Sequence, residues 1–326
     1  MSTRMDRRVA IAALLAPLLV PQRLWAEDYP VRPIKFVVPF PAGGPADLFA
    51  RLLTNRLAAD LGQPFVIENR AGVGGLAGVE AVVKSTPDGY TIGLSSSSAL
   101  SIYPFMVSRM PFDWSKDLTL LTLVVRVPEV LVVLPSLHLS TLQELVDHAR
   151  AHPHTISFGS AGTGSITHLA GELLKTEAKI DLVHVPYRGA NPAVNDLLGG
   201  HIHMAVLDVP ILLPHIRSGA LKALAVTSRE RSAALPDVPT TAEAGFKSVL
   251  SDNWYGLVAP AGLPASVASK LATATIAALR SAELKKQFAA QDAVTSPSSA
   301  EEFAAFVVTE QAKWGPIVAA TGAKLE

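Results

Sequence analysis

Short apolar runs alternate with amphipathic segments along most of the chain. Residues 34–40 form a nearly continuous apolar run, as expected for a strand that is covered on both faces of a sheet. In contrast, residues 46–61 repeat leucines every three to five positions and stop at Gly62, which predicts a helix. This alternation predicts an α/β fold in which mostly parallel strands are flanked by helices.

The same pattern divides the rest of the chain. Two close strands at 118–125 and 129–134 predict a crossing into a second lobe, and the strand at 254–259 predicts the return. Thr141 and Glu144 have the spacing of a capping box. Further strands are predicted at 65–68, 91–94, 156–158, 182–185, 202–207 and 221–227, and further helices at 76–84, 142–151, 165–178, 191–198, 211–217, 266–279, 282–290 and 300–320.

Two glycine-rich turns lie far apart in the sequence, at residues 39–47 and 159–165. Each follows a predicted strand and opens a predicted helix, so that unpaired backbone N–H groups point to one place with the positive helix end behind them. Such a turn binds anions without a formal positive charge. Two of them suggest two lobes that hold one anionic molecule between them.

Short hydroxyl side chains gather at the ends of predicted strands, at 95–98 and at Ser160, Thr163 and Ser165. Together with bare N–H groups they suit a carboxylate that binds and leaves without reaction. Asp47 either contacts a ligand or only stabilises its own helix, and Asp208 either accepts from a ligand or caps the next helix. Arg188, in the turn 187–189, either pairs with a ligand carboxylate or lies on the surface.

Composition and motifs exclude several other classes. The formal net charge of the 326 residues is zero, so nothing favours a nucleic-acid partner, and the absence of cysteine excludes disulfides and thiolate chemistry. Residues 72–78 miss the dinucleotide-binding spacing, no P-loop is present, and His201 with His203 lacks a third metal ligand. We therefore expect no cofactor and no metal.

The N-terminus predicts export. Arg4, Arg7 and Arg8 precede an apolar stretch at 9–20, and Ala26 offers a small residue for cleavage. Residues 1–26 are thus interpreted as a signal peptide for the Sec or the twin-arginine route, with a membrane anchor as the alternative. The stretch is short for a bilayer span.

Ser165 and His168 stand three positions apart on a predicted helix, close enough to interact. A serine hydrolase would use them as nucleophile and base, but a triad also needs an acid that spacing alone does not supply. The alternative is that Ser165 caps the helix while His168 lines or supports the cleft.

A set of segments covers residues 29–326 almost from end to end in the order of one family. These are 29–34, 39–47 with 50–51, 68–72, 87–91, 162–168, 184–189, 196–200, 221–228, 235–240 and 254–262. As a set they resemble the periplasmic solute-binding receptors of tripartite tricarboxylate transporters, often called Bug receptors. The chain departs from the family pattern at Tyr103, where relatives often have asparagine, and at 246–247, where they often have Pro-Gly.

The resemblance implies a type II-like periplasmic binding protein whose two α/β lobes are joined by crossing strands and close over a small carboxylate. The lobes would comprise residues 27–124 with 252–326, and residues 125–251. It also implies a monomer that is not an enzyme and that delivers its ligand to one large and one small integral membrane subunit; a sensor that signals to a membrane partner is the alternative. The expected ligand-binding residues are Phe40, Ala42, Gly43, Gly44, Asp47, Ser95, Ser96, Ser97, Ser160, Ala161, Thr163, Gly164, Ser165, His168, Tyr187 and Asp208.

Overall fold

The computed structural model describes residues 29–322 and residue 324. The predicted signal peptide at 1–26 lies outside the described residues. In the part of the chain that is described, no helix is both long and apolar enough to cross a membrane.

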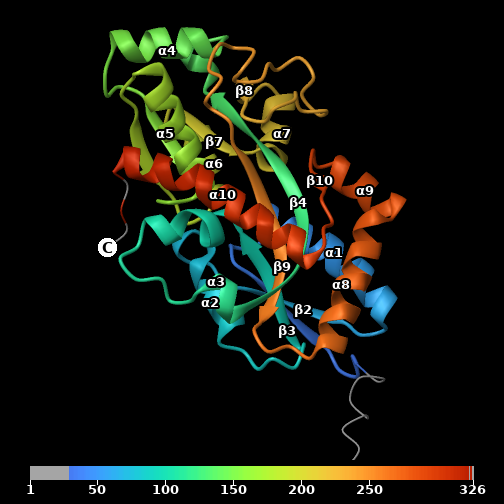
Figure 1. Cartoon of the computed structure of the whole chain (residues 1–326). Helices are drawn as coiled ribbons and strands as arrows, with labels where there is room; N and C mark the ends of the chain where they lie inside the picture. The colour runs from blue at the N-terminus through green and yellow to red at the C-terminus, as the bar shows by residue number, and fades with distance from the viewer. Residues whose placement is uncertain (1–28, 323, 325–326) are drawn as a thin grey trace, which may run out of the picture.

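Two long strands connect the lobes of the α/β fold, β4 (Leu118–Val133) and β9 (Asp252–Pro260), which run side by side through the middle of the molecule (Figure 1). The main path of the sheet follows the order β2-β1-β3-β9-β4-β7-β5-β6. Every antiparallel pairing between the described strands involves β4 or β9, whereas the strands inside each lobe pair in parallel. The predicted α/β class with crossing strands is confirmed.

The remaining elements agree closely with the hydrophobic pattern. The first lobe contains β1 (Ile34–Val38), β2 (Phe65–Asn69), β3 (Thr91–Ser96), α1 (Pro45–Leu61), α2 (Leu76–Val83), α3 (Trp114–Asp117), α8 (Ala265–Arg280) and α9 (Ala282–Ala289). The second contains β5 (Ser157–Ser160), β6 (Val183–Pro186), β7 (Met204–Asp208), β8 (Lys222–Val226), α4 (Leu142–Ala151), α5 (Ile166–Ala178), α6 (Ala190–Leu198) and α7 (Val209–Arg217). The short strand β10 (Val294–Thr295), which pairs with β4, and the short helix α3 are absent from the predicted elements.

The expectation of two separate strands at 118–125 and 129–134 was wrong, because β4 is continuous. Arg126 and Pro128 interrupt the apolar pattern, which made the sequence look like two runs. The backbone stays extended because β9 pairs with it as far as Pro128 and β7 and β8 pair with it beyond that point. Glu129 is fully buried in this strand.

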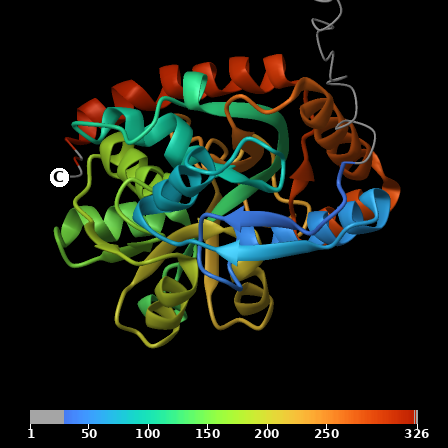
Figure 2. The same ribbon diagram turned by 90° about the horizontal axis from the view of Figure 1, so that it is seen from below.

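Helix α10 (Ala300–Thr321) is the last element and runs along the molecule from one lobe to the other (Figures 1 and 2). Its Trp314 and Val318 pack with Ile166 and Leu169 of α5 in one buried cluster. The C-terminal helix therefore adds a contact between the lobes beside the two crossing strands.

The capping box predicted at Thr141 is only half present. The Thr141 hydroxyl accepts from the Glu144 N–H at 3.1 Å and caps α4. The Glu144 carboxylate, however, accepts from the N–H of Ser140 instead of that of Thr141.

Candidate functional site

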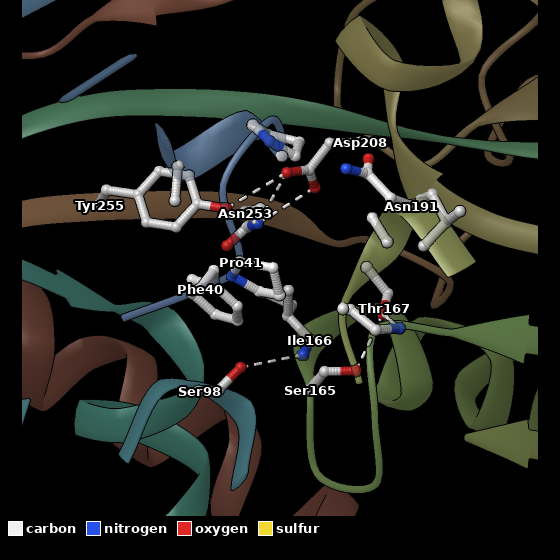
Figure 3. Close-up of a pocket in the computed structure, with 17 residues that line it drawn as sticks. Phe40, Pro41, Ser98, Ser165, Ile166, Thr167, Asn191, Asp208, Asn253 and Tyr255 are labelled. Atoms are coloured by element: carbon white, nitrogen blue, oxygen red, sulfur yellow. Dashed lines mark hydrogen bonds between the residues drawn. The ribbon is translucent and has the colours of Figure 1, made fainter. Parts of the chain in front are cut away.

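A cavity lies where the two glycine-rich turns meet the crossing strand β9 (Figure 3). The empty space between its atoms is about 520 Å³, part of which opens to solvent. Its lining is largely apolar and, among the described residues, includes no lysine, arginine or histidine. The lining residues are Phe40, Pro41, Gly44, Pro45, Ala46, Ser98, Ala161, Ser165, Ile166, Thr167, Gly189, Ala190, Asn191, Leu207, Asp208, Asn253 and Tyr255.

The first turn presents the N-terminus of α1 to this cavity. Gly43 adopts φ +77°, a conformation that suits glycine, and its N–H donates to Asp47 Oδ2 at 3.0 Å. Asp47 also accepts from Arg51 at 2.8 Å and from Asn69 at 3.0 Å. The carboxylate of Asp47 therefore holds the turn in shape, while the N–H of Ala46 has no acceptor among the described residues.

The second turn presents the N-terminus of α5. The Ser165 hydroxyl accepts from the His168 N–H, as an N-cap does, and donates to Gly162 O at 2.6 Å. Ile166 N donates to Ser98 Oγ at 3.2 Å, which links this turn to the first lobe. The next N–H along the helix, that of Thr167, has no acceptor in the described part of the chain.

A third helix, α6, also begins at the cavity, and sequence reasoning missed it as a site element. Gly189, at φ +114°, directs the chain so that Ala190 and Asn191 line the cavity. The N–H groups of these two residues have no acceptor within residues 29–322. The Asn191 side chain donates to Ala42 O at 3.5 Å, at the edge of hydrogen-bonding distance, and so reaches the other lobe. The only signal in the sequence was the strand-to-helix turn at 187–189.

The opposite wall of the cavity carries a carboxylate. Asp208, at the end of β7, accepts from Asn253 Nδ2 at 3.0 Å on both oxygens and from the Tyr255 hydroxyl at 3.3 Å. Burial raises the pKa of Asp208 to about 7, although the hydrogen bonds from Asn253 and Tyr255 work in the other direction. Asn253 and Tyr255 stand two apart on β9, so their side chains share one face of the strand.

The structure brings five of the predicted site residues to the cavity, namely Phe40, Gly44, Ala161, Ser165 and Asp208. Of the serine segment at 95–98, Ser98 lines the cavity. Ser95 donates to Gly256 O, Ser96 to Gly74 O and Ser97 to Asn253 Oδ1, so these hydroxyls face the protein, and Ser98 reaches the cavity instead. The predicted residues that do not line it are Ala42, Gly43, Asp47, Ser95, Ser96, Ser97, Ser160, Thr163, Gly164, His168 and Tyr187.

His168 lies behind the second turn. Its ring stacks on that of His184 with a centroid distance of 3.8 Å, and its Nδ1 accepts from the Gly164 N–H at 3.2 Å. Burial is the main reason that the pKa of His168 falls to about 3 and that of His184 to about 4. The Ser165 hydroxyl is bonded to Gly162 and Thr167, so the arrangement is a cap with a supporting histidine and lacks the geometry of a nucleophile and its base.

A second hollow adjoins the cavity and shares Phe40 and Ala161 with it. Thr163, Tyr187 and Arg188 line this hollow. The hydroxyl of buried Tyr103 donates to Thr163 O, in the second glycine-rich turn, at 2.9 Å. Tyr103 therefore bridges the two lobes. No group of three or more potential metal ligands occurs among the described residues.

Comparison with known proteins agrees with this architecture. The profile of the family described as "Tripartite tricarboxylate transporter family receptor" matches residues 49–323. Protein BugT of Bordetella pertussis is 40% identical over 321 residues, covering 98% of this chain and 96% of BugT.

Two solved structures are similar over their whole length. Periplasmic binding protein BugD superposes with a TM-score of 0.87 at 32% identity, covering 91% of this chain and 100% of BugD. An R. palustris protein solved with adipate superposes with a TM-score of 0.88 at 32% identity, covering 90% of this chain and 99% of that protein. The chain belongs to the tripartite tricarboxylate transporter receptor family.

Proposed function

We propose that this protein is a periplasmic solute-binding receptor that captures a small carboxylate in the cavity and delivers it to a membrane transporter with one large and one small integral subunit. The family match, the likeness to a periplasmic binding protein and the adipate in a similar structure support this proposal. The exported protein begins after residue 26 and works as a monomer.

The observation that carries the proposal is the convergence of three helix N-termini on one enclosed cavity. Unpaired N–H groups of Ala46, Thr167, Ala190 and Asn191 lie along it, and the helix dipoles add positive potential. Because these N–H groups are fixed by the helices before the ligand arrives, binding costs little ordering of the site. Catalysis is not proposed, because Ser165 acts as a helix cap.

The two lobes comprise residues 27–124 with 252–326, and residues 125–251, in this proposal. The strands β4 and β9 form the hinge between them. The contacts Ile166 N to Ser98 Oγ and Tyr103 Oη to Thr163 O hold the lobes together in the arrangement seen here. A ligand that contacts both turns stabilises this closed arrangement over an open one.

The test is thermal unfolding of residues 27–326, freed of any copurified ligand by unfolding and refolding, against a panel of mono-, di- and tricarboxylates and amino acids. A bound acid at about 100 times its Kd adds roughly 2.7 kcal/mol to the stability of the folded state. The primary amide of the same acid serves as the matched control and is expected to give no rise in Tm. An equal rise with acid and amide, or no rise with any acid, would contradict the proposal.

A further inference from the structure

The cavity has two chemically opposite ends (Figure 3). At one end Ser98, Ser165 and Thr167 surround the N-terminus of α5, where N–H groups and hydroxyls attract negative charge. At the other end lie Asp208, Asn253 and Tyr255, with the Asn191 side chain beside Asp208 and the apolar side chains of Phe40 and Pro41 between the two ends. A ligand that fits the cavity therefore meets donors at one end and a carboxyl group at the other.

The acidic end still has unused hydrogen-bonding capacity. A carboxylate offers about four acceptor positions, and Asp208 receives hydrogen bonds from Asn253 and Tyr255. The orientation of the Asn253 amide is fixed, because its oxygen accepts from Ser97 Oγ at 2.8 Å and from the Trp254 N–H at 2.9 Å. Its nitrogen therefore points at Asp208, and the remaining acceptor capacity of Asp208 is available to the cavity.

A second buried carboxyl group lies beside Asp208 at this end of the cavity. Glu129 on β4 is the register partner of Asp208 on β7, and its Oε1 has no hydrogen-bond partner in the described structure. Its Oε2 accepts from Ser251 Oγ. Asp252 adds further negative charge and Lys313 offsets part of it. When Asp208 is ionised, the Glu129–Asp208 pair therefore favours a positive or proton-donating group beside it and repels another anion.

We propose that the receptor selects acids whose end opposite the bound carboxylate carries a hydrogen-bond donor, an ammonium or a hydroxyl group, and rejects a second ionised carboxylate at that end. This inference rests on the proposed function, which assigns the carboxylate to the helix N-termini. Asp208 is the residue that contacts the donor, and Glu129 is a positioning residue that acts through Asp208.

The experiment is isothermal titration of ligand-free protein with γ-aminobutyrate, γ-hydroxybutyrate, butyrate and succinate, and with the next longer homologues of each, at pH 6 and pH 8.5. At pH 8.5 the acid with a distal ammonium is expected to bind at least about tenfold more tightly than the diacid of the same length. This preference is expected to shrink at pH 6, because protonation of Asp208 removes the charge that distinguishes the two ligands.

The variant Asp208→Asn keeps the shape of the side chain and is expected to reduce the amino-acid to diacid affinity ratio at least about tenfold. Asp292→Asn is the matched control, since Asp292 is a buried carboxylate that binds Ser232 Oγ away from the cavity, and it leaves the ratio unchanged. Glu129→Gln is expected to alter the pH dependence of the ratio, a change that a purely structural role would not produce.

A diacid that binds wild-type protein at pH 8.5 as tightly as the amino acid would overturn the inference while the proposed function stands. Failure of every acid to bind would overturn both.

Discussion

The side-chain amide of Asn253 donates to both carboxylate oxygens of Asp208 at 3.0 Å. One residue stands on the crossing strand β9 and the other at the end of β7, so the contact ties a crossing strand to the second lobe. Ser97 of the first lobe supports the same amide from behind. The hydrogen bonds from Ser97 to Asn253 and from Asn253 to Asp208 thus connect both lobes at the wall of the cavity.

This buried acidic pair makes stability depend on pH. Burial, and then the charge of Asp208, raise the pKa of Glu129 to about 8. When the pKa of a carboxyl group is higher in the folded state than in the unfolded state, the group stabilises the folded state fully only below its unfolded pKa. This contribution is lost as the pH rises through the pKa of the folded state. We expect the free energy of unfolding to fall in both proteins between pH 6.5 and 8.5. The fall in the wild type should exceed that in Glu129→Gln by on the order of 1 kcal/mol. Urea unfolding at both pH values measures this, and equal changes in the two proteins would contradict it.

Asp47 is expected to act through the shape of the first turn. In Asp47→Ala the Gly43 N–H and the Asn69 amide lose their acceptor, which costs about 1–3 kcal/mol in stability and weakens ligand binding. Asp60→Ala in the same helix is the control, because Asp60 forms a comparable pair with Arg56 in a more exposed place, where such pairs contribute about 0–1 kcal/mol. Urea unfolding and titration calorimetry compare the two variants. The assignment of Asp47 to the turn is wrong if both behave alike.

The stacked pair His168–His184 predicts loss of stability in acid. Because the pKa of each ring is lowered in the folded state, only the unfolded chain takes up these protons between pH 6.5 and about 4, and stability falls as the pH drops through that window. His184→Gln keeps a partner for Ser160 Oγ but does not titrate, so it should remove up to about 1.4 kcal/mol per pH unit of this dependence.

Unfolding at pH 7, 6 and 5 measures the effect of the histidine pair. A wild-type slope in His184→Gln would show that the buried pair does not control acid stability.

The third helix end is tested by Ala190→Pro. Ala190 is the first residue of α6, a position where proline fits, so the substitution removes one N–H from the cavity with little cost to the helix. We expect ligand affinity to fall about tenfold, in line with loss of a hydrogen bond to a charged group. Ala265→Pro makes the same change at the exposed first residue of α8 and should bind as the wild type does. Equal affinity of the two variants in calorimetry would remove α6 from the site.

The hydrophobic pattern was sufficient to predict nearly every strand and helix, because apolar spacing is a local property. It also located the turn at Gly43–Gly44 and that at Ser165. It placed the serine segment at 95–98 but could not show which of these serines lines the cavity, because that depends on the π-helical turn over Ser98–Ile102 in which the chain leaves β3. Asn253 and Tyr255 were missed for a similar reason. Their spacing of two shows that they share a face, but only the pairing of β9 with its neighbours shows that this face meets Asp208.

The most direct test of the central claim is to follow backbone amides by NMR while a binding acid is added. If the helix N-termini hold the carboxylate, the N–H resonances of Ala46, Thr167, Ala190 and Asn191 move downfield on saturation, as new hydrogen bonds to the carboxylate form. The N–H of Ala265, at the exposed start of α8, should stay in place. If the acid binds and these four resonances do not move, the carboxylate is not held by the helix N-termini.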